Sequence, residues 1–337
     1  MFKLAPVSGG KWKESTLYSF TGGKDGANLF DGVILDSSGN LYGTAAYGGR
    51  SGCNGAYQGC GVVFKLTPVS GGKWKESTLY SFTGGKDGGN PYGGLIFDVV
   101  GNLYGTTGSG GVGGYGTVFK LAPVSGGRWK ESTLQSFTGG KDGAFPEGLI
   151  FDAAGNLYGA TGGQDWLVFK LTRTSGHKWR ETVIHHFALG GPSYSVGHLI
   201  FDATGNLYGM TNFGGAHSYG TVYKLTPMSD GRWKASVIHA FGKFKDGAGP
   251  TGSLVFDAAG NLYGTTGSGG VHENGAVFKL MPTTGGGWKE SLLYSFTVGN
   301  DGGAPEGGVI LDNAGNLYGT TFRGGAHSVG VVFELTR

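Results

Sequence analysis

Two stretches of the sequence combine acidic, imidazole, amide and aromatic side chains suited to acid–base chemistry or to sugar binding. They are residues 162–166 and 188–198, and both interrupt the otherwise regular pattern of the chain. A carboxylate and an imidazole can exchange protons with a substrate, and an aromatic ring offers a flat face to a sugar ring. The candidate residues are Gln164, Asp165, Trp166, Tyr194 and His198, with Glu147 shortly before them.

Two interpretations of these residues are open at this stage. If the protein is an enzyme, we expect a lyase or hydrolase whose catalytic residues are Glu147, Asp165 and His198. Whether or not the protein is an enzyme, the residues of these stretches expected to bind the ligand are Gln164, Trp166 and Tyr194. Alternatively, a shortened loop has simply exchanged residues, and His198 faces solvent or fills the space of a glycine.

Three histidines in later glycine-rich segments are further candidates for ligand binding: His217, His272 and His327. Histidines that converge can hold a transition metal, so a metal site is one hypothesis. His217 and His327 occur in the same motif, Gly-Gly-Ala-His-Ser, which argues against a unique catalytic role for either. The sequence identifies no cofactor, because it contains no nucleophile motif, phosphate-binding loop or zinc signature.

The two cysteines, Cys53 and Cys60, lie in one loop with six residues between them. A disulfide that closes this loop is the favoured interpretation, and it implies an oxidising compartment. Two free thiols are the alternative. A metal site would need further cysteine or histidine ligands, and this loop has none.

The elements that must position these residues come from an internal repeat. The motif Asn-Leu-Tyr-Gly occurs six times, and successive copies begin between 50 and 62 residues apart. Each copy follows an apolar run that ends in Asp, and each precedes a glycine-rich loop. A period of this length indicates stacked supersecondary units. The copies begin at Asn40, Asn102, Asn156, Asn206, Asn261 and Asn316.

One repeat is predicted to contain four short strands, exemplified by residues 149–151, 157–159, 167–171 and 179–187. Apolar residues occupy both alternating faces of the fourth strand, which is typical of a strand buried on both sides. Short, evenly spaced strands with one aromatic motif per unit favour a β-propeller. A propeller also leaves few open strand edges, which otherwise promote aggregation.

The repeated polar residues have a structural explanation. In Asp-x-x-Gly-Asn, the Asp side chain is expected to bond its own backbone while Gly or Asn adopts positive φ. The same turn chemistry explains the repeated Lys-Asp-Gly of the glycine-rich segments, although it resembles a cradle for a cation or phosphate. The repeated Trp-Lys-Glu is interpreted as packing between blades plus a solvated ion pair.

At these residues the chain resembles a known family. The pattern Gly-x-(Leu/Val)-Ile-(Phe/Leu)-Asp-x-x-Gly-Asn-Leu-Tyr-Gly-Thr, followed by Gly-Thr-Val-Phe-Lys-Leu, resembles the bacterial GloVer tandem repeat over nearly the whole chain. The layout is also similar to NHL-type and streptogramin-lyase-type propellers. The resemblance implies a secreted or surface protein of undefined activity. No catalytic residue of a lyase can be placed on this sequence.

The number of copies predicts an all-β, six-bladed β-propeller of four-stranded blades that forms a single domain over residues 1–337. We expect residues 12–20 to close the ring by joining the C-terminal repeat. The third-strand motif occurs seven times, so one third strand, at Met1 to Pro6, is surplus: it hangs loose or competes with the C-terminus for one place.

Net charge and the length of the apolar runs argue against two classes of function. A formal net charge of +3, with lysines spread over the repeats, argues against nucleic-acid binding. No apolar run is long enough to span a membrane. The sequence therefore predicts a secreted or periplasmic binding module for carbohydrate or cell-surface polymer, on a face formed by the glycine-rich loops. A propeller lyase or hydrolase is the alternative. Oligomeric state and ligand identity are not specified by the sequence.

Overall fold

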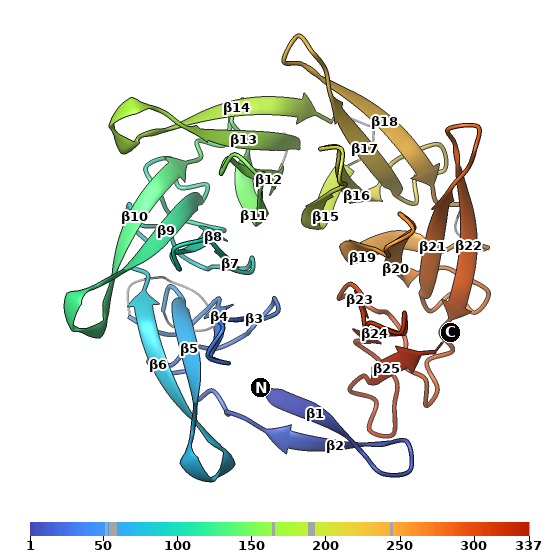
Figure 1. The fold of residues 1–337 in the computed structure, drawn as a ribbon, viewed down its shortest axis with the longest axis horizontal. Helices are drawn as coiled ribbons and strands as arrows, with labels where there is room; N and C mark the ends of the chain where they lie inside the picture. The colour runs from blue at the N-terminus through green and yellow to red at the C-terminus, as the bar shows by residue number, and fades with distance from the viewer. Residues whose placement is uncertain (51–52, 54–58, 164–165, 188–192, 243–244, 337) are drawn as a thin grey trace. The chain divides into compact units, whose positions relative to one another are not determined.

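The computed structural model describes residues 1–50, 53, 59–163, 166–187, 193–242 and 245–336 (Figure 1). The side chains of residues 177 and 193–196 lie outside the description. The chain forms two compact units. The first comprises Met1–Leu149 and Arg173–Arg180, and the second comprises Ile150–Thr172 and Glu181–Arg337. A single domain over residues 1–337 stays a prediction.

The fold is an all-β, six-bladed β-propeller of four-stranded antiparallel blades, as the repeat predicts. The strands of each blade follow one another in sequence order (Figure 1). Among the described residues, helix is limited to three single 3-10 turns between third and fourth strands. They are η1 (Ser70–Gly72), η2 (Ser125–Gly127) and η3 (Ser175–His177).

Two complete blades belong to the first unit. One consists of β3 (Ile34–Leu35), β4 (Leu41–Ala45), β5 (Val62–Val69) and β6 (Lys73–Ser81). The other consists of β7 (Ile96–Phe97), β8 (Leu103–Thr107), β9 (Thr117–Val124) and β10 (Arg128–Ser136). A further blade consists of β11 (Ala144–Phe151), β12 (Leu157–Gly162), β13 (Leu167–Arg173) and β14 (Trp179–His186).

Two more complete blades belong to the second unit. The first consists of β15 (Ser193–Phe201), β16 (Leu207–Phe213), β17 (Thr221–Pro227) and β18 (Trp233–Ala240). The second consists of β19 (Ala248–Phe256), β20 (Leu262–Ser268), β21 (Ala276–Pro282) and β22 (Trp288–Ser295). The last repeat forms a three-stranded sheet of β23 (Ile310–Leu311), β24 (Leu317–Thr320) and β25 (Val332–Leu335).

The N-terminal segment forms a two-stranded hairpin. β2 (Lys11–Thr16) pairs with β1 (Phe2–Val7) in a two-stranded sheet, and the closure of the ring by residues 12–20 with the C-terminal repeat stays a prediction. The expected surplus strand is thus the partner of β2, in the register that β5 and β6 share. Glycines with positive φ at positions 9 and 10 form the short turn between them. Closing so short a loop costs little conformational entropy.

The core of each blade depends on an aromatic ring that lies over a glycine. The glycine of Asn-Leu-Tyr-Gly is the direct cross-strand partner of the third-strand aromatic residue, as in the pair Gly105 and Phe119. A methyl group at Gly105 would lie 2.6 Å from the ring of Phe119. The other face of the contact comes from the preceding blade, because Phe82 meets Phe119 edge to face at 5.0 Å. Both phenylalanines are fully buried.

The same arrangement recurs in the second unit. A methyl group at Gly264 would lie 2.6 Å from the ring of Phe278, and Phe241 of the preceding blade meets Phe278 at 5.1 Å. Such edge-to-face pairs are favourable beyond the area that they bury. The repeated motif therefore codes for the inter-blade core, since only glycine leaves room for the ring.

The disulfide between Cys53 and Cys60 is present, as predicted. Cys60 is fully buried in a cluster with Phe82 and Leu95. The bond therefore ties Cys53 to the core of the first unit.

Replacing Gly105 by alanine should destabilise the protein by about 1–3 kcal/mol, because the added methyl group overpacks against Phe119. The control is Gly285→Ala, since Gly285 has ordinary φ and no atom within 4 Å of an added methyl group. Urea denaturation followed by circular dichroism measures both. Equal unfolding midpoints for the two variants would contradict this account of the motif.

Oxidation of Cys53 and Cys60 should make the intact protein lighter than its reduced form by a pair of hydrogens, as read by mass spectrometry. Replacing both cysteines by serine should cost at most about 3 kcal/mol of stability, because the closed loop is short. Two thiols that react with an alkylating reagent in the native, oxidised protein would show that the bond is not formed.

Candidate functional site

The structure describes only part of the sequence-predicted site. Gln164 and Asp165 lie outside the described residues, and the side chain of Tyr194 is not described. Glu147 is half-buried in β11 and belongs to the first unit, whereas Trp166 and His198 belong to the second. The convergence of these residues, and their catalytic or ligand-binding roles, therefore stay predictions.

His198 lies where two neighbouring inner strands of the second unit approach closely. Its backbone N–H donates to the Ser253 hydroxyl at 3.0 Å. A side chain at Gly197 would collide with the backbone carbonyl of Gly252, so the two strands meet at their glycines. His198 itself is half-buried. These contacts fix the backbone of His198 in position. They do not involve its imidazole.

The three later histidines are all exposed: His217, His272 and His327. Within the described part of the chain, no group of three or more histidine, cysteine or acidic side chains is placed to hold a metal ion. A metal site at these residues stays a hypothesis that the described geometry does not support. Their role in ligand binding stays a prediction.

A surface that the sequence analysis missed lies on the first unit, and we call it the aromatic surface: Phe30, Tyr47 and Tyr92. Phe30 is 60% exposed and Tyr92 is 41% exposed. Their rings meet edge to face at 5.3 Å, and the hydroxyls of Tyr47 and Tyr92 share a hydrogen bond of 3.1 Å. Burial, and then that hydrogen bond, raise the pKa of Tyr92 to about 12, so its hydroxyl stays protonated.

Backbone contacts fix the aromatic surface in place. The Asp31 carboxylate accepts hydrogen bonds from the N–H groups of Gly32 and Gly94, each at 2.6 Å, and so links the segments that precede β3 and β7 in two blades. The Tyr92 ring lies directly over Gly108, where an added methyl group would come within 2.6 Å of it. The exposed rings are therefore held in place before a ligand arrives. Because they are already ordered, their side chains lose little conformational entropy when a ligand binds.

A second aromatic pair on the first unit follows the same design. Tyr115 and Phe145 are both partly exposed, and their rings meet at 6.0 Å. The Tyr115 ring lies over Gly139, where an added methyl group would be 2.7 Å away.

The signal for the aromatic surface was present in the sequence. Phe30 and Tyr92 each lie six residues before the Asp that ends the apolar run, and the other repeats have no aromatic residue there. A comparison of this one position across the repeats would have found them.

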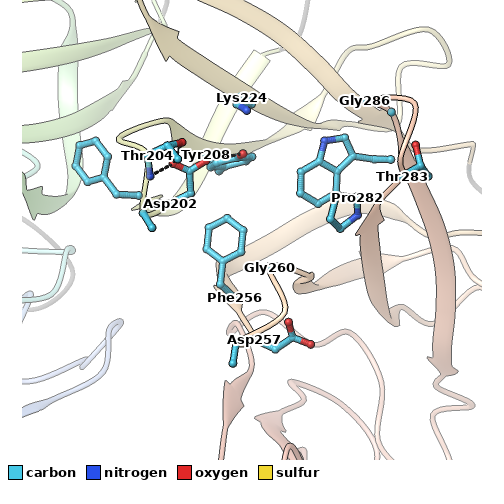
Figure 2. Close-up of a pocket in the computed structure, with 15 residues that line it drawn as sticks. Asp202, Thr204, Tyr208, Lys224, Phe256, Asp257, Gly260, Pro282, Thr283 and Gly286 are labelled. Carbon is cyan, nitrogen blue, oxygen red and sulfur yellow. Dashed lines mark hydrogen bonds between the residues drawn. The ribbon is translucent and has the colours of Figure 1, made fainter.

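The second unit carries two clefts at the ends of the blades where the tight turns lie. The first, the Tyr208 cleft, has a volume of about 600 Å³ and lies between the turn 202–205 and the turn before Trp288. Figure 2 shows Asp202 and Tyr208 on one side of it, Pro282 and Thr283 on the other, and Phe256 between them. The second, the Tyr158 cleft, has the same volume and is built from the preceding pair of blades.

Both clefts have the same aromatic walls. In the Tyr208 cleft, the Tyr208 ring meets Phe256 at 5.2 Å and Trp288 at 6.1 Å. The Lys224 ammonium lies 5.5 Å from the centre of the Tyr208 ring. The corresponding residues of the Tyr158 cleft are Phe201, Trp233 and Lys170. The repeated tryptophan thus packs against the preceding blade, as predicted.

The Asp turn beside each cleft is a closed hydrogen-bond network, which confirms its structural interpretation. Asp202 accepts hydrogen bonds from the backbone N–H groups of Thr204 and Asn206, both at 2.9 Å. It also accepts from the Asn206 amide at 2.7 Å and from the Tyr208 hydroxyl at 3.0 Å. Burial alone would raise the pKa of Asp202, but these hydrogen bonds outweigh it and hold the pKa at about 2.

Topology and packing define this chain as a six-bladed β-propeller, and solved propellers resemble it. A gluconolactonase of Xanthomonas campestris matches with a TM-score of 0.51 and 14% identity, over 93% of this chain and 88% of that chain. The calcium structure of a carbohydrate-active enzyme of Trichoderma reesei matches with a TM-score of 0.50 and 13% identity, over 93% and 94%. At such identities the likeness concerns the fold alone.

A third match is described as the extracellular domain of a one-component system of B. thetaiotaomicron. Its TM-score is 0.52 and its identity 12%, over 92% of this chain and 32% of that chain. The chain belongs to the Gloeobacter/Verrucomicrobia repeat family, which matches residues 1–166 and 163–337. No curated protein matches the sequence. Within the described residues, no helix is both long and apolar enough to cross a membrane.

The Asp turns should make stability fall in acid. The folded pKa of Asp202, about 2, is below the unfolded value of about 3.9, so its contribution is present above pH 4 and is lost as the pH falls towards 2. The equivalent Asp257 has the same low pKa. We expect the melting temperature to drop steeply between about pH 4 and pH 2.

Asp202→Asn should lower the melting temperature at neutral pH and flatten its acid dependence, because one of the titrating carboxylates is removed. Differential scanning calorimetry across this range measures both effects. A variant with the same acid dependence as the parent protein would show that the Asp turns do not govern acid stability.

Proposed function

We propose that this protein is a secreted or periplasmic binding protein that holds a polysaccharide chain on the aromatic surface of Phe30, Tyr47 and Tyr92. The observation that carries the proposal is that Phe30 and Tyr92 are exposed although they are large, apolar and fixed in position. Exposed apolar side chains that form a contiguous patch commonly mark a binding site, whereas single ones do not, and the rings of Phe30 and Tyr92 are in contact. Sugar rings present flat C–H faces that suit such side chains.

The polar groups of the surface suit the same ligand. The paired hydroxyls of Tyr47 and Tyr92 can donate to and accept from sugar hydroxyls, and the raised pKa of Tyr92 keeps its hydroxyl protonated at neutral pH. The pair Tyr115 and Phe145, on the same unit, offers further aromatic area. A chain polymer is therefore a better candidate than a single sugar unit. The disulfide between Cys53 and Cys60 supports an oxidising location outside the cytoplasm.

Phe30→Ala and Tyr92→Ala should each weaken polysaccharide binding about tenfold, or about 1.4 kcal/mol, and the double variant should abolish retention. Affinity electrophoresis against cellulose, xylan, chitin, β-glucan and peptidoglycan fragments measures the effect. The matched control is Phe322→Ala, because Phe322 is also 60% exposed but belongs to the second unit. Circular dichroism verifies folding, which these surface changes should alter by no more than about 1 kcal/mol.

Two results would overturn the proposal: retention by none of these polymers, or retention that the double variant leaves unchanged. The same incubations test the enzyme hypothesis, because a lyase or hydrolase would release new chain ends. Such a release, removed by His198→Ala in a folded protein, would instead support acid–base catalysis by Glu147, Asp165 and His198.

A further inference from the structure

The Tyr208 and Tyr158 clefts have the same arrangement of side chains, and neither contains a residue of the aromatic surface. Each cleft places a buried tyrosine beside a partly exposed phenylalanine and a partly exposed tryptophan, so its walls are aromatic. Each volume, about 600 Å³, is in the range of small-molecule sites. We propose that these two clefts are equivalent binding sites, each for one neutral hexose unit, so that one chain binds sugar at several points.

The charges of the Tyr208 cleft favour a neutral ligand. Lys224 places its ammonium group against the Tyr208 ring, the position that a cationic ligand would take in an aromatic cage. The carboxylates of Asp202 and Asp257 line the same cleft and would repel an anion. An uncharged sugar neither competes with the Lys224 ammonium for the face of the Tyr208 ring nor is repelled by the two carboxylates.

The polar groups at the rim of the cleft can orient such a ligand. Thr283 is exposed on the turn opposite Tyr208, and its hydroxyl can both donate and accept (Figure 2). Lys224 is half-buried and can donate to a sugar oxygen. Asp202, by contrast, already accepts hydrogen bonds from its own turn and serves to hold that wall rigid.

The arrangement is repeated beyond these two clefts. In the first unit, Tyr42 meets Phe97 at 5.2 Å and Trp129 at 6.4 Å, and the Lys65 ammonium lies 5.3 Å from the Tyr42 ring. Open sites of this kind bind single sugars weakly. Several equivalent sites on one chain raise the overall affinity for a branched or repeated glycan without any new contact.

The two proposals can fail separately, because the clefts and the aromatic surface share no residue. Ala203 lines both the Tyr208 and the Tyr158 cleft, and it is exposed on the Asp turn. A tryptophan at this position would fill space in both clefts without replacing a buried side chain. Asn313 occupies the equivalent turn position in the last repeat and does not line either cleft, so Asn313→Trp is the matched control.

The probes are the methyl α- and β-glycosides of glucose, galactose and mannose. Saturation-transfer NMR detects binding, and equilibrium dialysis measures the stoichiometry. At least one of these glycosides should bind with more than one equivalent per chain. Ala203→Trp should lower the stoichiometry by about two equivalents, because it blocks both clefts. Asn313→Trp should leave it unchanged.

The double variant Phe30→Ala, Tyr92→Ala should retain this hexose binding even where polysaccharide retention is lost. The proposal is overturned if none of the glycosides binds, if only one equivalent binds, or if Ala203→Trp, shown to be folded by circular dichroism, binds as the parent protein does.

Discussion

An aromatic ring that lies over a glycine on the neighbouring strand is the contact on which each blade of this propeller depends. In the first unit, Phe119 covers Gly105 on its own blade and meets Phe82 of the preceding blade edge to face. The glycine creates the space, the ring fills it, and the second ring ties adjacent blades together. Glycine is therefore required for packing as well as for turns. The glycine of Asn-Leu-Tyr-Gly is the residue that packing requires in each repeat.

Repeated and unrepeated residues have different tasks in this molecule. The repeated Asp, Asn and Tyr of each turn satisfy one another by hydrogen bonds, as Asp202, Asn206 and Tyr208 do. Residues that depart from the repeat, such as Phe30 and Tyr92, can be exposed because the core does not need them. The clefts are an intermediate case, because the same packing of Tyr, Phe, Trp and Lys that joins two blades also leaves a hollow beside it.

The fold was predictable because its signals are local and are repeated in sequence. The apolar run, the Asp turn and the Leu-Tyr-Gly strand each appear in every repeat, and the Cys53–Cys60 bond followed from their shared loop. The pairing of β2 with the adjacent β1 was not predicted, because a count of strands does not show which strands of the N-terminal segment pair with each other. The aromatic surface was missed although Phe30 and Tyr92 stand out at one position of the repeat, because the sequence does not show that these two side chains are exposed. The grouping of Glu147, Asp165 and His198 stays a prediction.

The local pairing of β1 with β2 illustrates a property of every described sheet, namely that each strand pairs with its neighbours in the sequence. Contacts of this kind give a low contact order within a blade, and low contact order goes with fast folding. A blade can therefore complete its ladder of hydrogen bonds as soon as its own residues have left the ribosome, without waiting for later repeats. Such a chain exposes unpaired strands only briefly during synthesis, which limits the opportunity for nearly identical repeats to pair with the wrong copy.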